Sequence, residues 1–385
     1  MNREYILLTV NALCASKIYS TKFAKCILRG LVKILLTLYP APFPMKLRIL
    51  THLKNPAFHL LVAACIGLGA QSQDITRADQ LKSSDIPDIM WVKQWPEPGK
   101  NQRSHSFKER FNTIFLGKKT PVLSKPVSVS ATDTGNFWAL DQSAMSAFHI
   151  KDEVGDMPHF FQKAGYDFTS LVAICAAPDG SLYFSDSQAN KIYRILPDKK
   201  KVQPFGDSLV QPTGIAFSSL TNEIWVVETG AHRISVLNSK GQIVKQIGAR
   251  GTSPGEFNYP THIWVDNSGL VYVVDAMNFR IQVMNPSGAV VSVFGKPGDA
   301  SGYLSRPKGI ATDSHGNIYI ADALFHVVQV FDLTGKYLYN LGAQGQGKGE
   351  FWMPSGIFID KKDYLYVADT YNSRIQIFQL VYALK

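Results

Sequence analysis

The chain has 385 residues, of which 45% are hydrophobic and 18% charged, so it can build a folded core and is not a disordered chain. Its formal net charge of +10 lies almost entirely in residues 1–73, which carry +8 and leave +2 for the rest. A nucleic-acid-binding protein carries its positive charge on the folded domain. The lysines at 199–201 follow Pro197-Asp198, as in an exposed turn. The charge distribution therefore excludes a nucleic-acid partner.

Residues 45–73 have the order of a secretory signal. Three cations within residues 46–54 precede an apolar run from Ala57 to Ala70, and polar residues follow. The run is too short to cross a bilayer comfortably. Met45 is therefore favoured as the true start, with residues 1–44 a mis-assigned N-terminal extension. The alternative is a genuine basic amphipathic extension.

Two exits from this leader stay open. Val62-Ala63-Ala64-Cys65 resembles a lipoprotein box, in which the cysteine would be acylated, whereas Ala70-Gln71-Ser72 offers small residues for ordinary signal cleavage. Both predict an exported protein, periplasmic or associated with the cell envelope, and an acylated Cys65 or a retained leader would attach it to the membrane. Cys175 is the only cysteine after residue 73, so the body cannot form an internal disulfide.

Residues 74–124 are predicted to supply a strap and a closing strand. Trp91 and Trp95, followed by prolines at positions 96 and 98, indicate a strap lying on the body rather than a separate domain. The closing strand is expected at Arg110–Gly117.

Residues 125–385 repeat one pattern six times. In each copy a β-rich run with an aromatic residue in second place ends in a carboxylate. The six runs are Phe137–Asp141, Leu182–Asp186, Ile224–Glu228, Val271–Asp275, Ile318–Asp322 and Leu365–Asp369. The carboxylates are 45, 42, 47, 47 and 47 residues apart, which suits four short strands with their turns and is too short for independent domains.

The fifth copy shows where the strands fall. Turn residues at Ser314–Asn317 and Leu333–Gly335 separate its β-rich runs, and no sustained helical period follows residue 124. One four-stranded unit cannot bury both of its faces, so the copies must pack side by side, and a ring removes the exposed ends. The sequence therefore predicts an all-β, six-bladed β-propeller of four-stranded blades over residues 125–385.

The fourth copy carries the fullest motif. It comprises Gly248, Gly251–Phe257, Tyr259-Pro260, Asp266, Val271–Asp275, Asn278 and Arg280–Val283. This set resembles an NHL repeat, as do copies five and six, whereas copies one and two have Ser146 and Lys191 where the arginine belongs. The resemblance implies NHL-type blades, and it extends to a bacterial group of exported six-bladed NHL proteins.

The ends of the array predict how the ring closes. After Arg374–Leu380 the chain stops without the glycine turn and outer strand of the other copies, and Arg110–Gly117 resembles the outer strands that end at Gly248, Gly295 and Gly342. We expect this N-terminal strand to pair with Arg374–Leu380 and complete the last blade.

The recurring carboxylate, with asparagine three and arginine five residues later, is interpreted as a structural repeat motif. Its members in the best copies are Asp275, Asn278, Arg280, Asp369, Asn372 and Arg374. The carboxylate is expected to accept turn amides, and the arginine to pair with a neighbouring blade. The glycine-rich segments 248–255 and 342–349 lead into strands rather than helices, so they are blade linkers and not phosphate loops.

Function in a propeller usually gathers at its channel. Counting back from the turn glycines places Ser128, Ala173, Gly214, His262, Gly309 and Gly356 on the channel wall. A metal enzyme needs three or more converging ligands. Of this column of six wall positions, only His262 could bind a metal ion. The amidating lyases share NHL repeats, but one histidine does not reproduce their multi-histidine centre, and sugar-lactone hydrolases need channel carboxylates that this column lacks.

Loop residues after the second strands suggest a binding surface. His232 and His326 occupy this connection in copies three and five, and could join Phe325, Phe279 and Tyr371 there; the alternative is ordinary exposed loop residues. No catalytic residues and no cofactor are predicted. The sequence favours a non-enzymatic binding or scaffold propeller that engages a protein, peptide or glycan at the channel mouth or loop face. The alternative is a metal-dependent lyase or hydrolase with a site near His262.

Overall fold

The computed structural model describes residues 86–97, 123–133, 135–151, 154–156, 166–197 and 201–383, all within the compact unit Asp74–Lys385. The predicted leader, with its two exits, and the segment 110–117 lie outside the described residues. Among the described residues, no helix is long and apolar enough to span a membrane.

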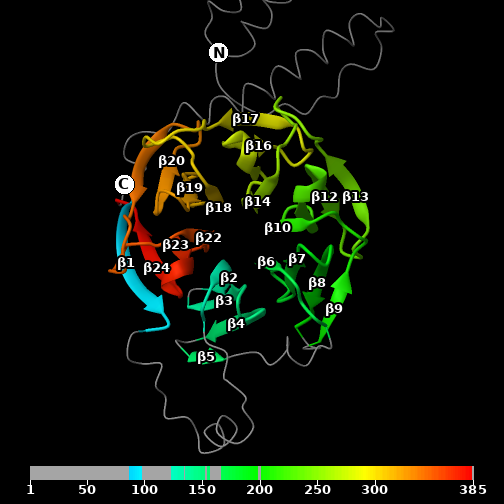
Figure 1. The fold of residues 1–385 in the computed structure, drawn as a ribbon, viewed down its shortest axis with the longest axis horizontal. Coiled ribbons are helices and arrows are strands. Elements are labelled where there is room, and N and C mark those ends of the chain that lie inside the picture. The colour runs from blue at the N-terminus through cyan, green and yellow to red at the C-terminus, as the bar shows by residue number, and fades with distance from the viewer. Residues whose placement is uncertain are drawn as a thin grey trace, which may run out of the picture. The chain divides into compact units, whose positions relative to one another are not determined.

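Six antiparallel four-stranded sheets stand around a common axis as the blades of a propeller (Figure 1). Blade 1 comprises β2 (Pro126–Asp133), β3 (Asn136–Asp141), β4 (Ser146–Lys151) and β5 (Val154–Asp156). Blade 2 comprises β6 (Leu171–Ala176), β7 (Leu182–Asp186), β8 (Lys191–Ile195) and β9 (Val202–Phe205). Blade 3 comprises β10 (Pro212–Ser218), β11 (Glu223–Glu228), β12 (Arg233–Leu237) and β13 (Ile243–Ile247).

The remaining blades follow the same order. Blade 4 comprises β14 (Pro260–Val265), β15 (Val271–Asp275), β16 (Arg280–Met284) and β17 (Val290–Phe294). Blade 5 comprises β18 (Pro307–Thr312), β19 (Ile318–Asp322), β20 (Val327–Phe331) and β21 (Tyr337–Leu341). Blade 6 comprises β22 (Pro354–Ile359), β23 (Tyr364–Asp369), β24 (Arg374–Val381) and β1 (Asp88–Trp95). Short 3-10 turns follow three second strands: η2 (Thr229–Ala231), η3 (Ala276–Asn278) and η4 (Thr370–Asn372).

The predicted all-β, six-bladed architecture is confirmed, and the repeat pattern marks one strand in each blade. Every carboxylate-ended run is the second strand of its blade. These strands lie between two neighbours and their side chains are almost wholly buried, which explains their nearly continuous hydrophobic sequence.

The strand that completes the last blade is β1, so the expectation that Arg110–Gly117 would pair with Arg374–Leu380 is wrong as to the segment. β1 pairs antiparallel with β24, from Asp88 opposite Val381 to Trp95 opposite Ile375 (Figure 1). Trp91 and Trp95, interpreted from the sequence as a strap, therefore belong to a strand. Trp95 also contacts Phe148 of blade 1, with ring centroids 5.8 Å apart.

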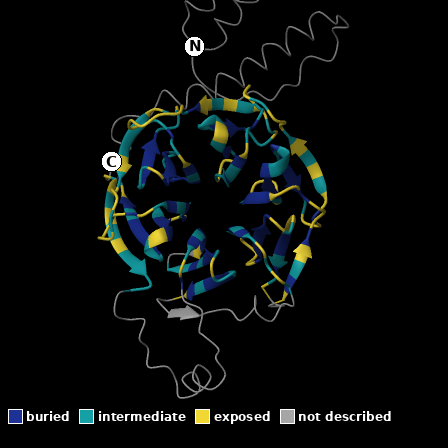
Figure 2. Ribbon diagram, in the orientation of Figure 1, coloured by how far each residue is buried: buried dark blue, intermediate teal, exposed yellow. Residues whose placement is uncertain are grey.

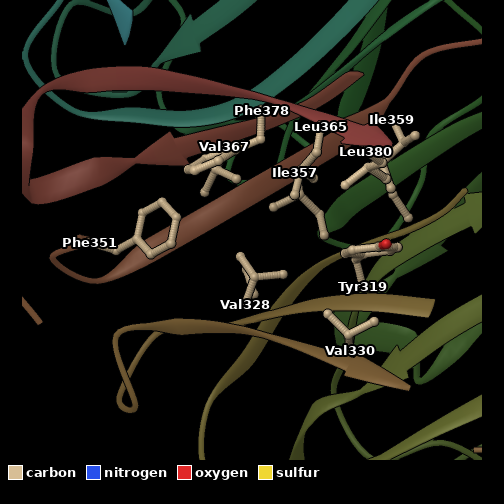
Figure 3. Packing of buried hydrophobic residues seen from close by; sticks show 12 residues of the cluster. Tyr319, Val328, Val330, Phe351, Ile357, Ile359, Leu365, Val367, Phe378 and Leu380 are labelled. Atoms are coloured by element: carbon tan, nitrogen blue, oxygen red, sulfur yellow. The ribbon is translucent and has the colours of Figure 1, made fainter. Parts of the chain in front are cut away.

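The hydrophobic core lies between adjacent blades. Between blades 5 and 6, Val328 and Val330 of β20 face Val367 of β23, with Phe351 from the linker at one end (Figure 3). Each such interface buries side chains from both blades, whereas the outermost strands alternate partly buried and exposed positions (Figure 2). No blade has a core of its own, which is why the repeat must close on its neighbours.

Small residues on the first strands allow neighbouring blades to meet at the axis. A Cβ added at Gly309 would lie 2.5 Å from the backbone nitrogen of Ile357, and one at Gly356 would lie 2.6 Å from the Cα of Ser128. These separations are below van der Waals contact, so a larger residue would push adjacent blades apart.

Candidate functional site

The channel of the propeller opens into one cavity of about 1450 Å³. All six residues placed on the channel by counting back from the turn glycines line it: Ser128, Ala173, Gly214, His262, Gly309 and Gly356. Most of its other lining residues lie between this level and the turns that join the first and second strands, and we call that end of the channel the wide mouth.

His262 is the one large side chain in this column. Its Nδ1 atom is buried without a hydrogen-bond partner among the described residues. Burial, helped by the positive charge of Lys308 on the neighbouring blade, lowers the pKa of His262 to about 3. The imidazole is therefore neutral at physiological pH. Nowhere in the described part of the chain do three histidine, cysteine or carboxylate side chains gather so as to hold a metal ion.

Sequence reasoning missed a polar and aromatic rim at the wide mouth. Trp138 stacks on His149 with ring centroids 4.2 Å apart, and His149 Nε2 lies 2.6 Å from Oδ1 of Asn136. All three residues line the cavity. The cross-strand partner of Trp138 depends on strand register, which the sequence does not show without the pairing of β3 and β4.

A buried carboxyl group lies at the same mouth. Asp313 accepts hydrogen bonds from Asn317, Tyr319 and Tyr382. Burial raises the pKa of Asp313 above its usual value, although these hydrogen bonds oppose the rise. The related carboxylates of Asp266 and Asp360 accept bonds from tyrosine hydroxyl groups on the same pattern. The spacing from aspartate to tyrosine is the same in these three copies of the repeat, so the sequence carried a signal for this pair.

Cys175 also lines the cavity. It is the one cysteine in the described part of the chain, and burial raises its pKa to about 12, so it stays a neutral thiol.

The motif carboxylates lie at the opposite end of the blades. Asp275 accepts hydrogen bonds from the backbone N–H of Asn258 and from the side chains of Asn278, Arg280 and Gln282. Arg280 also donates to backbone carbonyls of the linker that precedes its blade. In blade 6, Asp369, Asn372 and Arg374 repeat these contacts.

The prediction that the motif arginine pairs with a neighbouring blade is therefore wrong. Arg280 and Arg374 bind the carboxylate of their own blade and the linker entering it, rather than a neighbouring blade. The carboxylate accepts the amide of that linker, so the motif fixes each linker to the second and third strands of the blade it enters.

His232 and His326 hold neighbouring blades together instead of meeting at a surface. The Nδ1 atom of His232 accepts the backbone N–H of Tyr259 at 3.0 Å, and that of His326 accepts the N–H of Met353 at 3.0 Å. Both histidines have positive φ, 55° and 59°. Only 8% of His232 is exposed. The structure brings neither histidine to His262, which lies on the channel wall.

Exposed apolar side chains gather on the face where the first strands begin, which we call the loop face. They are Val210, Tyr259, Met277, Leu324, Trp352 and Tyr371, each between 42% and 55% exposed. All come from the linkers into first strands or the connections after second strands, and these two sets of loops bond to each other. Tyr371 donates its N–H to Trp352 O at 3.1 Å, and Met277 to Asn258 O at 3.0 Å.

The other residues predicted for a binding surface differ in how far they are exposed on this face. Tyr371 is exposed and contacts Trp352, with ring centroids 5.9 Å apart. Phe279 and Phe325 are only partly exposed. The more exposed members, Met277 and Leu324, were missed because aliphatic loop residues do not stand out in a single sequence.

Comparison with known proteins agrees with this fold. The model of a family described as "6-bladed beta-propeller" matches residues 209–285 and 305–384, which carry most of blades 3 to 6. A curated relative, lactonase drp35 of Staphylococcus saprophyticus, is 28% identical over 124 residues, or 30% of this chain. The chain spans only about a third of that lactonase, since the match covers 35% of it.

Solved structures share the architecture. A catalytically inactive virginiamycin B lyase from Staphylococcus aureus with quinupristin aligns with a TM-score of 0.51 and 18% identity, covering 68% of this chain and 97% of the lyase. An auxiliary nutrient binding protein from Bacteroides thetaiotaomicron aligns with a TM-score of 0.54 and 13% identity, covering 66% of this chain and 69% of that one. At these identities the likeness concerns the fold alone, because one propeller fold serves many functions.

Proposed function

We propose that this chain is a non-catalytic binding propeller that engages a protein partner through its loop face. The observation that supports this most is the set of six exposed apolar side chains on that face. Exposed apolar surface gathered on one face is a common feature of protein interaction sites. Tyrosine and tryptophan are also the side chains that most often dominate binding energy. The blades would serve as the rigid frame of this surface, and their repeats would be of the NHL type.

The protein partner is favoured over a peptide or glycan because the exposed residues extend over blades 3 to 6 rather than lining one cleft. Val210 and Tyr259 flank blade 3, whereas Trp352 and Tyr371 belong to the linker and turn of blade 6. A surface spread over several blades suits a broad protein interface of standard size.

Substitution on the loop face tests this function. We expect the triple variant Met277→Ser, Leu324→Ser, Tyr371→Ser to bind the partner at least ~100-fold more weakly, because hot-spot side chains each contribute about 2 kcal/mol or more. The partner is first captured from an envelope extract on the full-length wild-type chain, identified by mass spectrometry, and then purified for measurement of the dissociation constant.

A matched triple variant controls for the loss of any exposed apolar group. Met90→Ser, Val244→Ser and Val291→Ser remove residues of outermost strands that are 51–53% exposed. This control should bind as the wild type does, and both variants should keep the wild-type unfolding temperature. Equal affinity of the loop-face variant and the wild type would contradict the proposal. Stoichiometric metal in the wild type that is lost in His262→Ala would favour the metal-dependent lyase or hydrolase instead.

We further propose that the protein is exported through the leader at residues 45–73. The proposal draws on the order of charged, apolar and small residues there. Mass spectrometry of the labelled mature N-terminus should find either an acylated Cys65 or a start near Ser72. Recovery of peptides from residues 46–60 in the mature protein would contradict cleavage of this leader.

A further inference from the structure

The wall of the wide mouth carries large aromatic side chains on one side and small side chains on the other. Each first strand places one residue opposite the aromatic residue that stands second in the repeat. In blades 1 to 6 these first-strand residues are Ser130, Cys175, Ala216, Trp264, Ala311 and Phe358. Blades 1 to 3 thus have only small residues at this level, and all three of these residues line the cavity. The cavity is therefore open on the side of blades 1 to 3.

Trp264 and Phe358 form an aromatic wall on the other side. They belong to blades 4 and 6, and their ring centroids are 5.3 Å apart with an interplanar angle of 79°. Nε1 of Trp264 donates a hydrogen bond to Oγ1 of Thr312 in blade 5 at 2.9 Å. Both rings are half-buried and line the cavity. The two rings therefore meet across blade 5, held in place, with their exposed part bordering the cavity.

Trp138 lies across the channel from this wall, because blade 1 is opposite blade 4 in the ring of six (Figure 1). In the other five blades the aromatic residue in second place is at most 5% exposed, whereas Trp138 is half-buried and lines the cavity. Its stack on His149, and the contact of His149 with Asn136, hold the indole ring in place. A ligand in the cavity therefore meets aromatic surface on two opposite sides.

The charged groups of the wide mouth are mostly negative. Among the described residues that line the cavity there are five aspartates and one lysine: Asp179, Asp266, Asp313, Asp360, Asp363 and Lys361. The whole chain after residue 73 carries +2, so this negative charge is a local feature. Like charges around a cleft with walls of low dielectric constant concentrate the electrostatic potential and attract a ligand of opposite sign. The mouth therefore favours a cation over a neutral or anionic ligand.

His262 on the channel wall fits a cationic ligand as well. It lines the same cavity, and its Nδ1 atom is buried without a hydrogen-bond partner among the described residues. Buried polar atoms in native proteins nearly always have a partner. Burial lowers the pKa of His262 to about 3, so the ring adds no positive charge to the wall. A neutral imidazole also keeps one nitrogen that accepts a hydrogen bond from a ligand N–H group.

We propose that the wide mouth binds an organic cation with an apolar body, an amine that carries an aromatic ring or an alkyl chain. The body lies between Trp138 and the wall of Trp264 and Phe358, and the ammonium group faces the aspartates. Aromatic faces attract cations directly, and tryptophan does so most strongly. Pockets of about 300–1,000 Å³ bury drug-sized ligands, and this cavity of about 1450 Å³ has room for one. The site goes beyond the proposed function, because the wide mouth and the loop face lie at opposite ends of the blades.

Ligand-observed NMR titration of the full-length chain tests the site with three probes of one shape. They are 3-phenylpropylamine, 3-phenylpropanol and 3-phenylpropionate, which are cationic, neutral and anionic at neutral pH. We expect the amine to bind at least ~10-fold more tightly than the alcohol, and the propionate to bind most weakly, because the aspartates attract the ammonium group and repel the carboxylate. A fourth probe, methyl β-glucoside, represents a sugar ligand.

The double variant Asp179→Asn, Asp363→Asn tests the role of charge. It should bind the amine about 2- to 30-fold more weakly, the range for losing two exposed ion-pair partners, and should bind the alcohol as the wild type does. The matched control Asp207→Asn, Asp299→Asn removes the same charge from exposed positions outside the cavity. This control should bind the amine as the wild type does.

The variant Trp138→Leu tests the place of the apolar body. It keeps an apolar side chain but removes the indole ring, so it should bind the amine and the alcohol about 2- to 10-fold more weakly. The matched control Trp352→Leu, on the loop face, should bind both probes as the wild type does. Should Trp138→Leu fail to fold, the aspartate variants decide.

Three results would overturn the proposal. The first is a wild type that does not bind the amine. The second is tighter binding of the propionate, the alcohol or the glucoside than of the amine. The third is equal affinity for the amine in the Asp179→Asn, Asp363→Asn variant and in its control. Each of these results leaves binding at the loop face untouched, since the loop-face variants keep every residue of the wide mouth.

Discussion

Deleting Asp88–Trp95 is expected to make the protein aggregate. The deletion removes β1 and leaves the eight-residue strand β24 with an unpaired edge. It also removes the hydrogen bond from Nε1 of Trp91 to Oε1 of Gln376, at 3.0 Å, and the contact of Trp95 with Phe148 of blade 1. Because domains are stable by only about 5–15 kcal/mol, losing one strand of blade 6 should exhaust most of that margin. Size-exclusion chromatography and urea unfolding measure the outcome.

Deletion of Arg110–Gly117 is the matched control, since it removes the same number of residues from the same N-terminal region. Blade 6 keeps all four of its strands in this variant, so we expect a monodisperse protein with nearly the wild-type urea midpoint. Aggregation after deletion of Arg110–Gly117, together with a soluble Asp88–Trp95 deletion, would contradict the assignment of the outer strand.

The second large effect is expected from Asp369→Ala. The carboxylate of Asp369 is fully buried and accepts hydrogen bonds from Trp352 N, Asn372 and Gln376, besides its ion pair with Arg374 at 2.7 Å. Its removal leaves the guanidinium of Arg374 buried without its anion, which costs about 3–5 kcal/mol. Urea unfolding should show this loss in the free energy of unfolding. The loss should extend to β1, because Arg374 also donates to Oε1 of Gln94 at 2.8 Å.

Two further substitutions bracket this result. Asp275→Ala, in the equivalent position of blade 4, should lose a similar amount because Arg280 makes the same ion pair there. Asp299→Ala, at an exposed position, should change stability by about 0.5 kcal/mol or less. An Asp369→Ala variant no less stable than Asp299→Ala would show that the motif carboxylate is not structural.

The fold could be predicted from the sequence because each copy of the repeat forms one blade. A buried second strand ending in a carboxylate every 42 to 47 residues fixes the number of blades and the place of each inner strand. The closing strand was not readable in this way. Arg110–Gly117 ends in glycine as other outer strands do, whereas Asp88–Trp95 has no such ending and carries a register shift between Trp91 and Lys93.

The channel wall could be predicted and the roles of its histidines could not. The six wall positions followed from the spacing of turn glycines, because each wall residue lies at nearly the same distance along the chain from the turn that ends its inner strand. The role of His232 depends on a positive φ that turns its ring toward the next linker, and backbone angles leave no trace in one sequence.

Site-specific photo-crosslinking in the native cells tests the central claim, that a partner binds the loop face, most directly. A photoreactive residue at position 371 or 277 should form one discrete adduct with a single protein. The same residue at position 244 or 291, on the outermost strands β13 and β17, should form none. Adducts that arise only from the outermost strands would contradict binding through the loop face, as would the absence of any adduct from positions 371 and 277.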